Sequence, residues 1–119
     1  MRLTFRRHSK KLNVKRFTER WKALQKNCAS RKTWPKALAE ADDLLDKALK
    51  QRHFKGKTTG ARLVAAQHEL TDNGSVWLSH KYCQRMNKKI DVRTLKKKEV
   101  AQALAGFRQA LRDLGALEQ

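Results

Sequence analysis

The strongest constraint on the fold is the spacing of the apolar residues, which recur every three or four positions along most of the chain. One face of a helix between residues 34 and 54 is formed by Trp34, Leu38, Ala41, Leu45, Ala48 and Leu49. The same period predicts helices over residues 17–28, 61–70, 75–89 and 96–114. We therefore expect an all-α fold of about five helices without strands. Short connections favour an antiparallel bundle of the last four helices, with the first packed across it.

Helix ends are marked by capping and turn residues. The caps that we expect are Asn13 or Thr18, Thr33, Thr58 or Thr59, Ser75 and, after the last helix, Gly115. The third helix should bury Leu63, Val64, Ala66 and Leu70, and the fifth Val100, Leu104, Phe107, Leu111 and Leu114. The three tryptophans, Trp21, Trp34 and Trp77, each fall in an apolar pattern. We expect them in the core or between helices rather than stacked on nucleic-acid bases.

The charge balance predicts a polyanionic partner. The 119 residues contain 29 Lys and Arg against 11 Asp and Glu, a formal net charge of +18. Self-repulsion on this scale is tolerable when a polyanion neutralises it, and nucleic acid is the most common polyanion in cells. No apolar run approaches the roughly 20 residues of a membrane span, and no signal-peptide core follows the basic N-terminus. We expect a cytoplasmic protein that does not bind membranes.

Two stretches concentrate the positive charge. Residues 1–16 have the composition of an extended arm that orders on nucleic acid, followed by a helical domain over residues 17–119. The second stretch, residues 75–98, ends in three lysines at the start of a helix, where free N–H groups favour an anion. The phosphate contacts that we expect are Arg2, Arg6, Arg7, Lys10, Lys11, Lys15 and Arg16 in the arm and Lys81, Arg85, Lys88, Lys89, Arg93, Lys96, Lys97 and Lys98 in the second patch.

Other chemistries have weak support in the sequence. Cys28 and Cys83 have no partner at metal-ligand spacing, and the four histidines are scattered, so we expect neither a disulfide nor a metal or other cofactor. A GKTT sequence at residues 56–59 lacks the earlier glycine and the preceding strand of a phosphate-binding loop. An acidic cluster occurs in the first half of the second helix, where negative charge interacts favourably with the helix dipole. We expect these side chains on the solvent-facing side of the helix. The members of the cluster are Glu40, Asp42, Asp43 and Asp46.

From Trp21 onward the chain resembles a small bacterial helical family related to the HEPN domains, with the matching segments covering most of residues 34–117. The similarity rests on WPKALAEADDLLDKALKQRHFKGKTTGARLVAAQHEL, VWLSHK and LKKKEVAQALAGFRQALRDLGAL. It implies a HEPN-like bundle, in which ribonuclease members carry an Arg and, four to six residues later, a His on one helix. Here Cys83-Gln84 stand where the Arg and its polar neighbour belong, and Lys88 where the His belongs. The resemblance thus implies loss of the ribonuclease motif.

These observations favour a non-enzymatic RNA-binding protein without a small-molecule substrate. We expect it in the ribosome or another large ribonucleoprotein, with rRNA and neighbouring ribosomal proteins as partners and recognition of RNA shape. A first alternative is a toxin-like HEPN ribonuclease that uses Arg62 with His68, or Arg85 with another base. A second is a DNA-binding protein with a recognition helix at residues 75–89, although that helix lacks a persuasive set of base-reading side chains.

Overall fold

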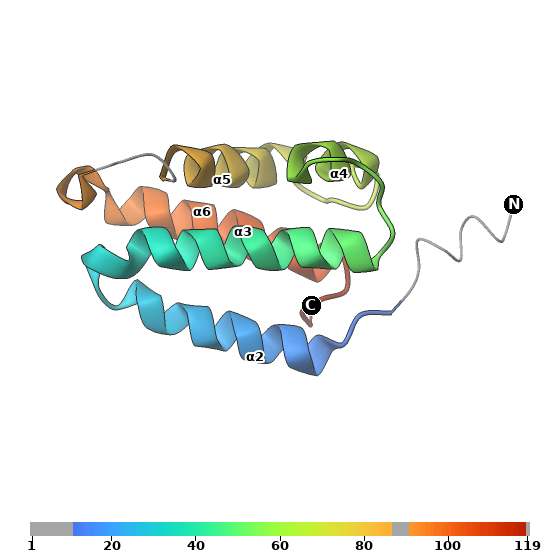
Figure 1. Ribbon diagram of the computed structural model, residues 1–119, viewed down its shortest axis with the longest axis horizontal. Helices are drawn as coiled ribbons and strands as arrows, with labels where there is room; N and C mark the ends of the chain where they lie inside the picture. Colours follow the sequence, from blue (N-terminus) through green and yellow to red (C-terminus); the bar gives the residue numbers. More distant parts are fainter. Residues whose placement is uncertain (1–10, 87–90, 119) are drawn as a thin grey trace, which may run out of the picture.

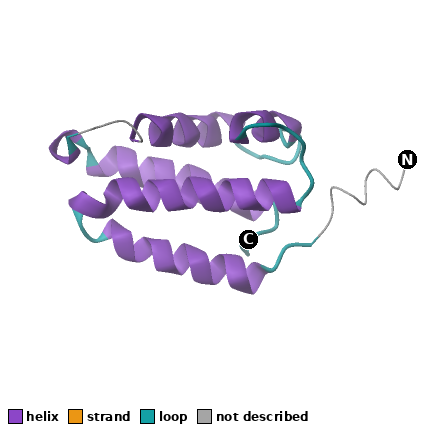
Figure 2. Ribbon diagram, in the orientation of Figure 1, coloured by secondary structure: helices purple, strands orange, loops and turns teal. Residues whose placement is uncertain are grey.

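The chain forms a bundle of helices in a computed structural model that describes residues 11–86 and 91–118 (Figure 1). Every regular element in these residues is helical, which confirms the predicted all-α fold (Figure 2). The α-helices are α2 (Val14–Gln25), α3 (Trp34–Gln51), α4 (Thr59–Ala65), α5 (Asn73–Met86) and α6 (Lys97–Asp113). Three short 3-10 helices lie in the connections: η1 (Lys26–Cys28), η2 (Arg31–Thr33) and η3 (Val92–Thr94).

Helix α3 is the centre of the bundle and contacts each of the other α-helices that the structure describes. Its residues Leu38, Ala41, Leu45, Ala48 and Leu49 are fully buried, as the apolar spacing predicts. Helices α5 and α6 form an antiparallel pair against it. Helix α2 lies antiparallel alongside α3 rather than across the bundle as predicted (Figure 1). The reason is the short connection through η1 and η2, which returns the chain along the helix that precedes it.

Helix α2 begins three residues before the predicted start of the domain at residue 17. The side chain of Asn13 caps it, accepting a hydrogen bond from the Arg16 N–H at 3.0 Å. Leu12 is buried in the core, which fixes the entry of the chain into the helix. Lys15 and Arg16, which the charge pattern predicts to lie in the arm, are therefore helical. Residues 1–10 lie outside the described residues.

Helix α4 is shorter than predicted because it ends at Ala65. Thr58 caps its start, accepting from the Ala61 N–H at 3.1 Å, which confirms one of the two expected caps. Beyond Ala65 the chain turns, and the turn brings Leu70 into the core. Val64 is wrongly predicted as buried, since it is 51% exposed: a helix of this length turns only one narrow face toward α3.

The capping chemistry of two other helices differs from the prediction. Helix α5 is capped by Asp72, whose carboxylate accepts from the Ser75 N–H at 3.0 Å and from the Ser75 hydroxyl at 2.7 Å. Ser75 therefore lies inside the first turn. Thr33 precedes α3 as expected, but its hydroxyl donates to the Asn27 carbonyl at 2.6 Å and does not cap the helix. The end of α6 is as predicted, with Gly115 at a φ of +82°.

The tryptophans pack within the bundle, as predicted. Trp21 and Trp34 are buried, and the Trp34 indole N–H donates to the Cys28 carbonyl at 2.9 Å, which ties α3 to η1. Trp77 is half-buried, with its ring edge-on to His80. Helices α5 and α6 approach so closely at Gly106 that a side chain there would overlap the Ser79 hydroxyl. Leu104, predicted to be buried, is only partly so and packs against the core.

Candidate nucleic-acid interface

One end of the bundle brings together two connections that are far apart in sequence. The α2–α3 connection contributes η1 and η2, and the α5–α6 connection contributes η3, which contacts η2. The Arg31 guanidinium donates a hydrogen bond to the Leu95 carbonyl and lies 4.7 Å from the centroid of the Trp34 ring. These contacts hold the connections side by side. We call the cationic surface here the basic end; its residues are Lys26, Arg31, Lys32, Arg93, Lys96, Lys97 and Lys98.

The side chains of the basic end are exposed, and few acids oppose them. Asp91 binds Arg93 through hydrogen bonds of 2.9 to 3.2 Å, and these bonds hold the pKa of Asp91 below its ordinary value. Lys96 precedes α6 without a side-chain cap, and Lys97 and Lys98 follow in the first turn. The backbone N–H groups and the lysines of this turn are thus placed to meet the same external anion.

A second group of cations surrounds a recess of about 310 Å³ between α2 and α3. Arg16 and Arg20 lie one turn apart on α2, and Lys47 approaches from α3; the three side chains line the recess beside Phe17. Sequence reasoning found Arg16 but missed Arg20 and Lys47. Arg20 could have been identified from its four-residue spacing to Arg16, because this spacing places both side chains on one face of a helix. Lys47 joins them only through the packing of α3 on α2.

The structure divides the predicted phosphate contacts among separate places. Arg93, Lys96, Lys97 and Lys98 gather at the basic end. Lys11, Lys15 and Arg16 lie at the start of α2, at the opposite end of the bundle, separated from the basic end by about 18 Å of helix. Lys81 is exposed on α5, and Arg85 lies over the Tyr82 ring at 5.1 Å. The remaining predicted contacts, Arg2, Arg6, Arg7, Lys10, Lys88 and Lys89, lie outside the described residues.

Sequence reasoning missed the η1–η2 contribution to the basic end. Lys26 falls within the predicted first helix and Arg31 and Lys32 in the break that follows it, and nothing local distinguishes them from other surface cations. Their partner segment begins about sixty residues later in the chain, so only the tertiary structure places them beside α6.

The alternative ribonuclease pair does not lie on one helix. Helix α4 ends at Ala65, so the exposed His68 follows the helix that carries Arg62. The Arg62 guanidinium binds both carboxylate oxygens of Asp46, at 2.8 and 3.0 Å, and donates to the Gly56 carbonyl at 2.6 Å. Burial alone would raise the pKa of Asp46, but the hydrogen bonds from Arg62, Thr59 and Lys50 lower it overall. Arg62 therefore joins α4 to α3.

The position aligned with the ribonuclease arginine is also structural. Cys83 is buried, and its thiol donates to the Leu38 carbonyl at 3.5 Å. Burial, with smaller effects from Asp42 and Asp43, raises the pKa of this thiol to about 12. The thiol is therefore protonated at neutral pH and packs as a small apolar group.

The sequence predicts that the acidic cluster of α3 faces solvent, but three of its four carboxylates bind other elements. Asp42 contacts the buried His80 ring nitrogen Nδ1 at 2.9 Å, and Glu40 accepts from the Asn27 amide at 2.6 Å. Asp46 binds Arg62. Only Asp43 is exposed, and burial and the neighbouring carboxylates raise its pKa. Long-range partners of this kind leave no periodic signal in the sequence.

The described residues bear on two other functions, metal binding and membrane insertion. No group of three or more His, Cys, Asp or Glu side chains in these residues is placed to hold a metal ion. None of the helices described is both long and apolar enough to cross a bilayer.

Comparison with known proteins found no matching family model and no significant match among curated proteins or solved structures. The resemblance to HEPN domains therefore stays a prediction.

Proposed function

We propose that the protein is a non-enzymatic RNA-binding protein that acts in the cytoplasm as part of the ribosome or another large ribonucleoprotein. The observation that supports this most is the basic end, where seven cations from two distant connections share one surface with few acids. Phosphate contacts of this kind dominate the affinity of proteins for nucleic acid.

The arrangement suits an RNA of defined shape better than a single nucleotide. The basic end and the α2–α3 recess are separated by about 9 to 15 Å along α2, the rise from Arg20 and from Arg16 to Lys26. Two cationic surfaces at this distance can contact separate stretches of one folded backbone. On sequence grounds alone, we propose Arg2, Arg6, Arg7 and Lys10 as further phosphate contacts. Recognition would follow the shape of the RNA backbone, because lysines dominate the basic end and their contacts to phosphate oxygens do not depend on the base sequence.

Salt titration of RNA binding tests the basic end. The double variant Lys97→Ala/Lys98→Ala should bind a structured RNA more weakly and lower the slope of log affinity against log salt by about 1.4 to 1.8. The matched control is Lys55→Ala/Lys57→Ala, which removes two exposed lysines from the α3–α4 connection at the other end of the bundle. Equal losses in both variants would argue against a localised interface. Wild-type protein that binds no RNA would refute the proposed function.

Sucrose-gradient sedimentation of the tagged protein from its own cells tests the ribosomal assignment. We expect stoichiometric travel with one ribosomal subunit that persists at high salt, because buried phosphate contacts are screened less than exposed ones. Protein that stays at the top of the gradient at low and high salt would exclude the ribosome as its site of action.

A further inference from the structure

The α2–α3 recess adjoins a second recess between the same two helices, of about 370 Å³, and Arg20 and Lys47 line both. The second recess also contains Glu40 and Asp43 of α3. We call the surface of the two recesses the α2–α3 seam; its charged residues are Arg16, Arg20, Glu40, Asp43 and Lys47. Cations line one part of the seam, and acids line the next.

The cations of the seam are available to an external anion. Arg16, Arg20 and Lys47 are exposed, and none of their side chains has an ion-pair or hydrogen-bond partner in the part of the chain that the structure describes. Arg52 and Arg62, by contrast, each bind a carboxylate within the bundle.

The acids of the seam lie between two groups of cations. Helix α3 runs from the basic end toward Lys47 and carries Glu40 and Asp43 on the way. The connection that closes the seam belongs to the basic end, and Lys26 there lies about 9 Å beyond Arg20 along α2. A single nucleic-acid strand that followed the seam would bring its phosphates against the two carboxylates. Two strands, one on each side of the acids, would avoid this repulsion.

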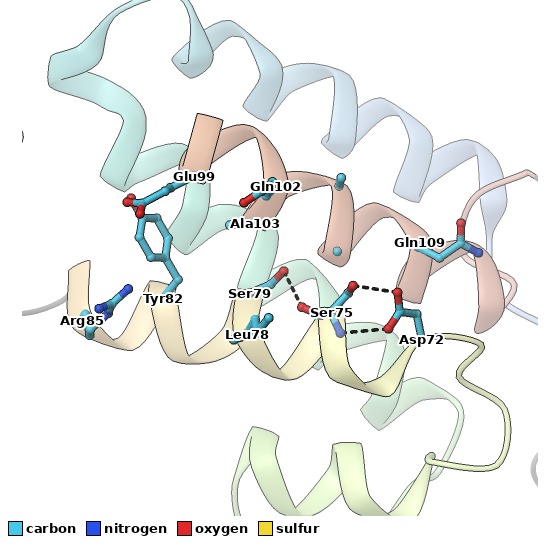
Figure 3. Close-up of a pocket in the computed structure, with 12 residues that line it drawn as sticks. Asp72, Ser75, Leu78, Ser79, Tyr82, Arg85, Glu99, Gln102, Ala103 and Gln109 are labelled. Carbon is cyan, nitrogen blue, oxygen red and sulfur yellow. Dashed lines mark hydrogen bonds between the residues drawn. The ribbon is translucent and has the colours of Figure 1, made fainter. Parts of the chain in front are cut away.

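The groove between α5 and α6 does not share this pattern. It has a volume of about 620 Å³, with Asp72 at one end and Arg85 and Glu99 at the other (Figure 3). These three are the charged residues among the described residues that line it, so its formal charge is −1. The groove therefore offers a polyanion no net attraction, and the seam is the better candidate for further RNA contacts.

The double helix of RNA has the features that match the seam. Its minor groove is wide and shallow, displays 2′-hydroxyl groups and is bordered by the phosphates of both strands. A 2′-hydroxyl can donate a hydrogen bond to a carboxylate that lies between the two phosphate rows. The major groove of B-DNA is about 8.5 Å deep, so a face of two adjacent helices does not reach its floor. DNA also lacks the 2′-hydroxyl.

We propose that the α2–α3 seam binds double-stranded RNA across its minor groove. The cations of the α2–α3 recess contact the phosphates of one strand, the basic end contacts those of the other, and Asp43 accepts a hydrogen bond from a 2′-hydroxyl between them. Asp43 is exposed, whereas Glu40 already accepts from the Asn27 amide at 2.6 Å. The inference rests on the proposed function and specifies the class of RNA.

Fluorescence anisotropy with three probes tests the class of RNA. The probes are an RNA duplex of about 16 base pairs, which presents two successive minor grooves, a DNA duplex of the same sequence, and one RNA strand alone. The RNA duplex should bind about tenfold more tightly than the others, the effect of one hydrogen bond to a charged group. A DNA duplex or single strand bound as tightly would overturn this inference and leave the proposed function standing. Binding of none of the probes at low salt would refute both.

Replacement of Asp43 separates a hydrogen bond from charge repulsion. Asp43→Ala should weaken binding of the RNA duplex about tenfold, whereas binding of the DNA duplex should stay the same or tighten. The matched control is Glu19→Ala, which removes an exposed acid of α2 that lines neither recess. Both variants have a net charge of +19 (18 plus 1), and the control should bind both duplexes slightly more tightly. An Asp43 variant that binds the RNA duplex as tightly as the wild type would overturn the proposal.

Discussion

At the scale of single residues, Gly106 controls how closely α5 and α6 pack. A Cβ atom at this position would overlap the Ser79 hydroxyl and lie 2.9 Å from the Ser75 carbonyl oxygen. Both atoms belong to α5, and the second is backbone that cannot move alone. The absence of a side chain therefore sets the separation of the two helices that form the groove.

We expect Gly106→Ala to lower the free energy of unfolding by about 1 to 3 kcal/mol, because the helices must separate to admit the methyl group. The matched control is Gly74→Ala in the first turn of α5, where the added Cβ meets only the Asp72 carboxylate at an ordinary 3.7 Å. That change should be neutral or stabilise by up to about 1 kcal/mol, since alanine favours the helix. Urea denaturation of both variants measures the difference; equal stabilities would contradict the close approach.

At the scale of elements, the end of α3 is joined to two other parts of the bundle by one buried side chain. Arg52 donates to the Leu114 carbonyl at 2.8 Å, at the end of α6, and to both carboxylate oxygens of Glu69 at 2.8 and 2.9 Å, in the α4–α5 connection. It is 6% exposed. Helix periodicity predicts where these elements run, but this guanidinium determines how their ends meet.

Replacement of Arg52 by methionine should destabilise the fold by about 2 to 4 kcal/mol. The change keeps most of the side-chain volume but leaves the Glu69 carboxylate and the Leu114 carbonyl without their donor. Lys50→Met is the control, since Lys50 is exposed and its contact with Asp46 is a surface ion pair worth less than about 1 kcal/mol. Thermal and urea unfolding measure both variants. A loss for the Arg52 variant no larger than for the control would contradict the proposed role.

At the scale of the whole molecule, the net charge of +18 acts against the compact state. The cations are not spread evenly: the basic end collects seven of them from two distant segments of the chain, residues 26–32 and 93–98. Screening or neutralisation of this charge should therefore stabilise the protein, whichever polyanion it meets in the cell.

The melting temperature should rise by several degrees between low salt and about 0.3 M sodium chloride, because about 1 kcal/mol shifts the midpoint of a domain this size by roughly 4 °C. The Lys97→Ala/Lys98→Ala variant has a net charge of +16 (18 minus 2) and should show a smaller rise. Circular dichroism at the helix band follows the transition. A midpoint that falls with salt would show that attractive ion pairs outweigh the repulsion.

Much of the fold follows from local patterns in the sequence. The apolar period predicts the five helices, and the caps at Asn13 and Thr58 and the glycine at residue 115 mark their ends, because these depend on residues within one or two turns. The exposure of Val64 and the capping role of Asp72 escaped prediction. The exposure of Val64 is decided by how the short helix α4 sits against α3. Asp72 and Ser75 are both good capping residues three positions apart, and the helix begins after the earlier one.

The sequence by itself determined the helical class, the buried face of α3 and the excess of positive charge. Only the tertiary structure decided which charges share a surface, which carboxylates of α3 bind partners, and where α5 and α6 leave a groove. The physical reason is range: helix formation depends on neighbours three or four residues away, whereas Arg31 and Leu95 meet across 64 positions. Contacts over such distances have no period, and the packing of the whole core sets them.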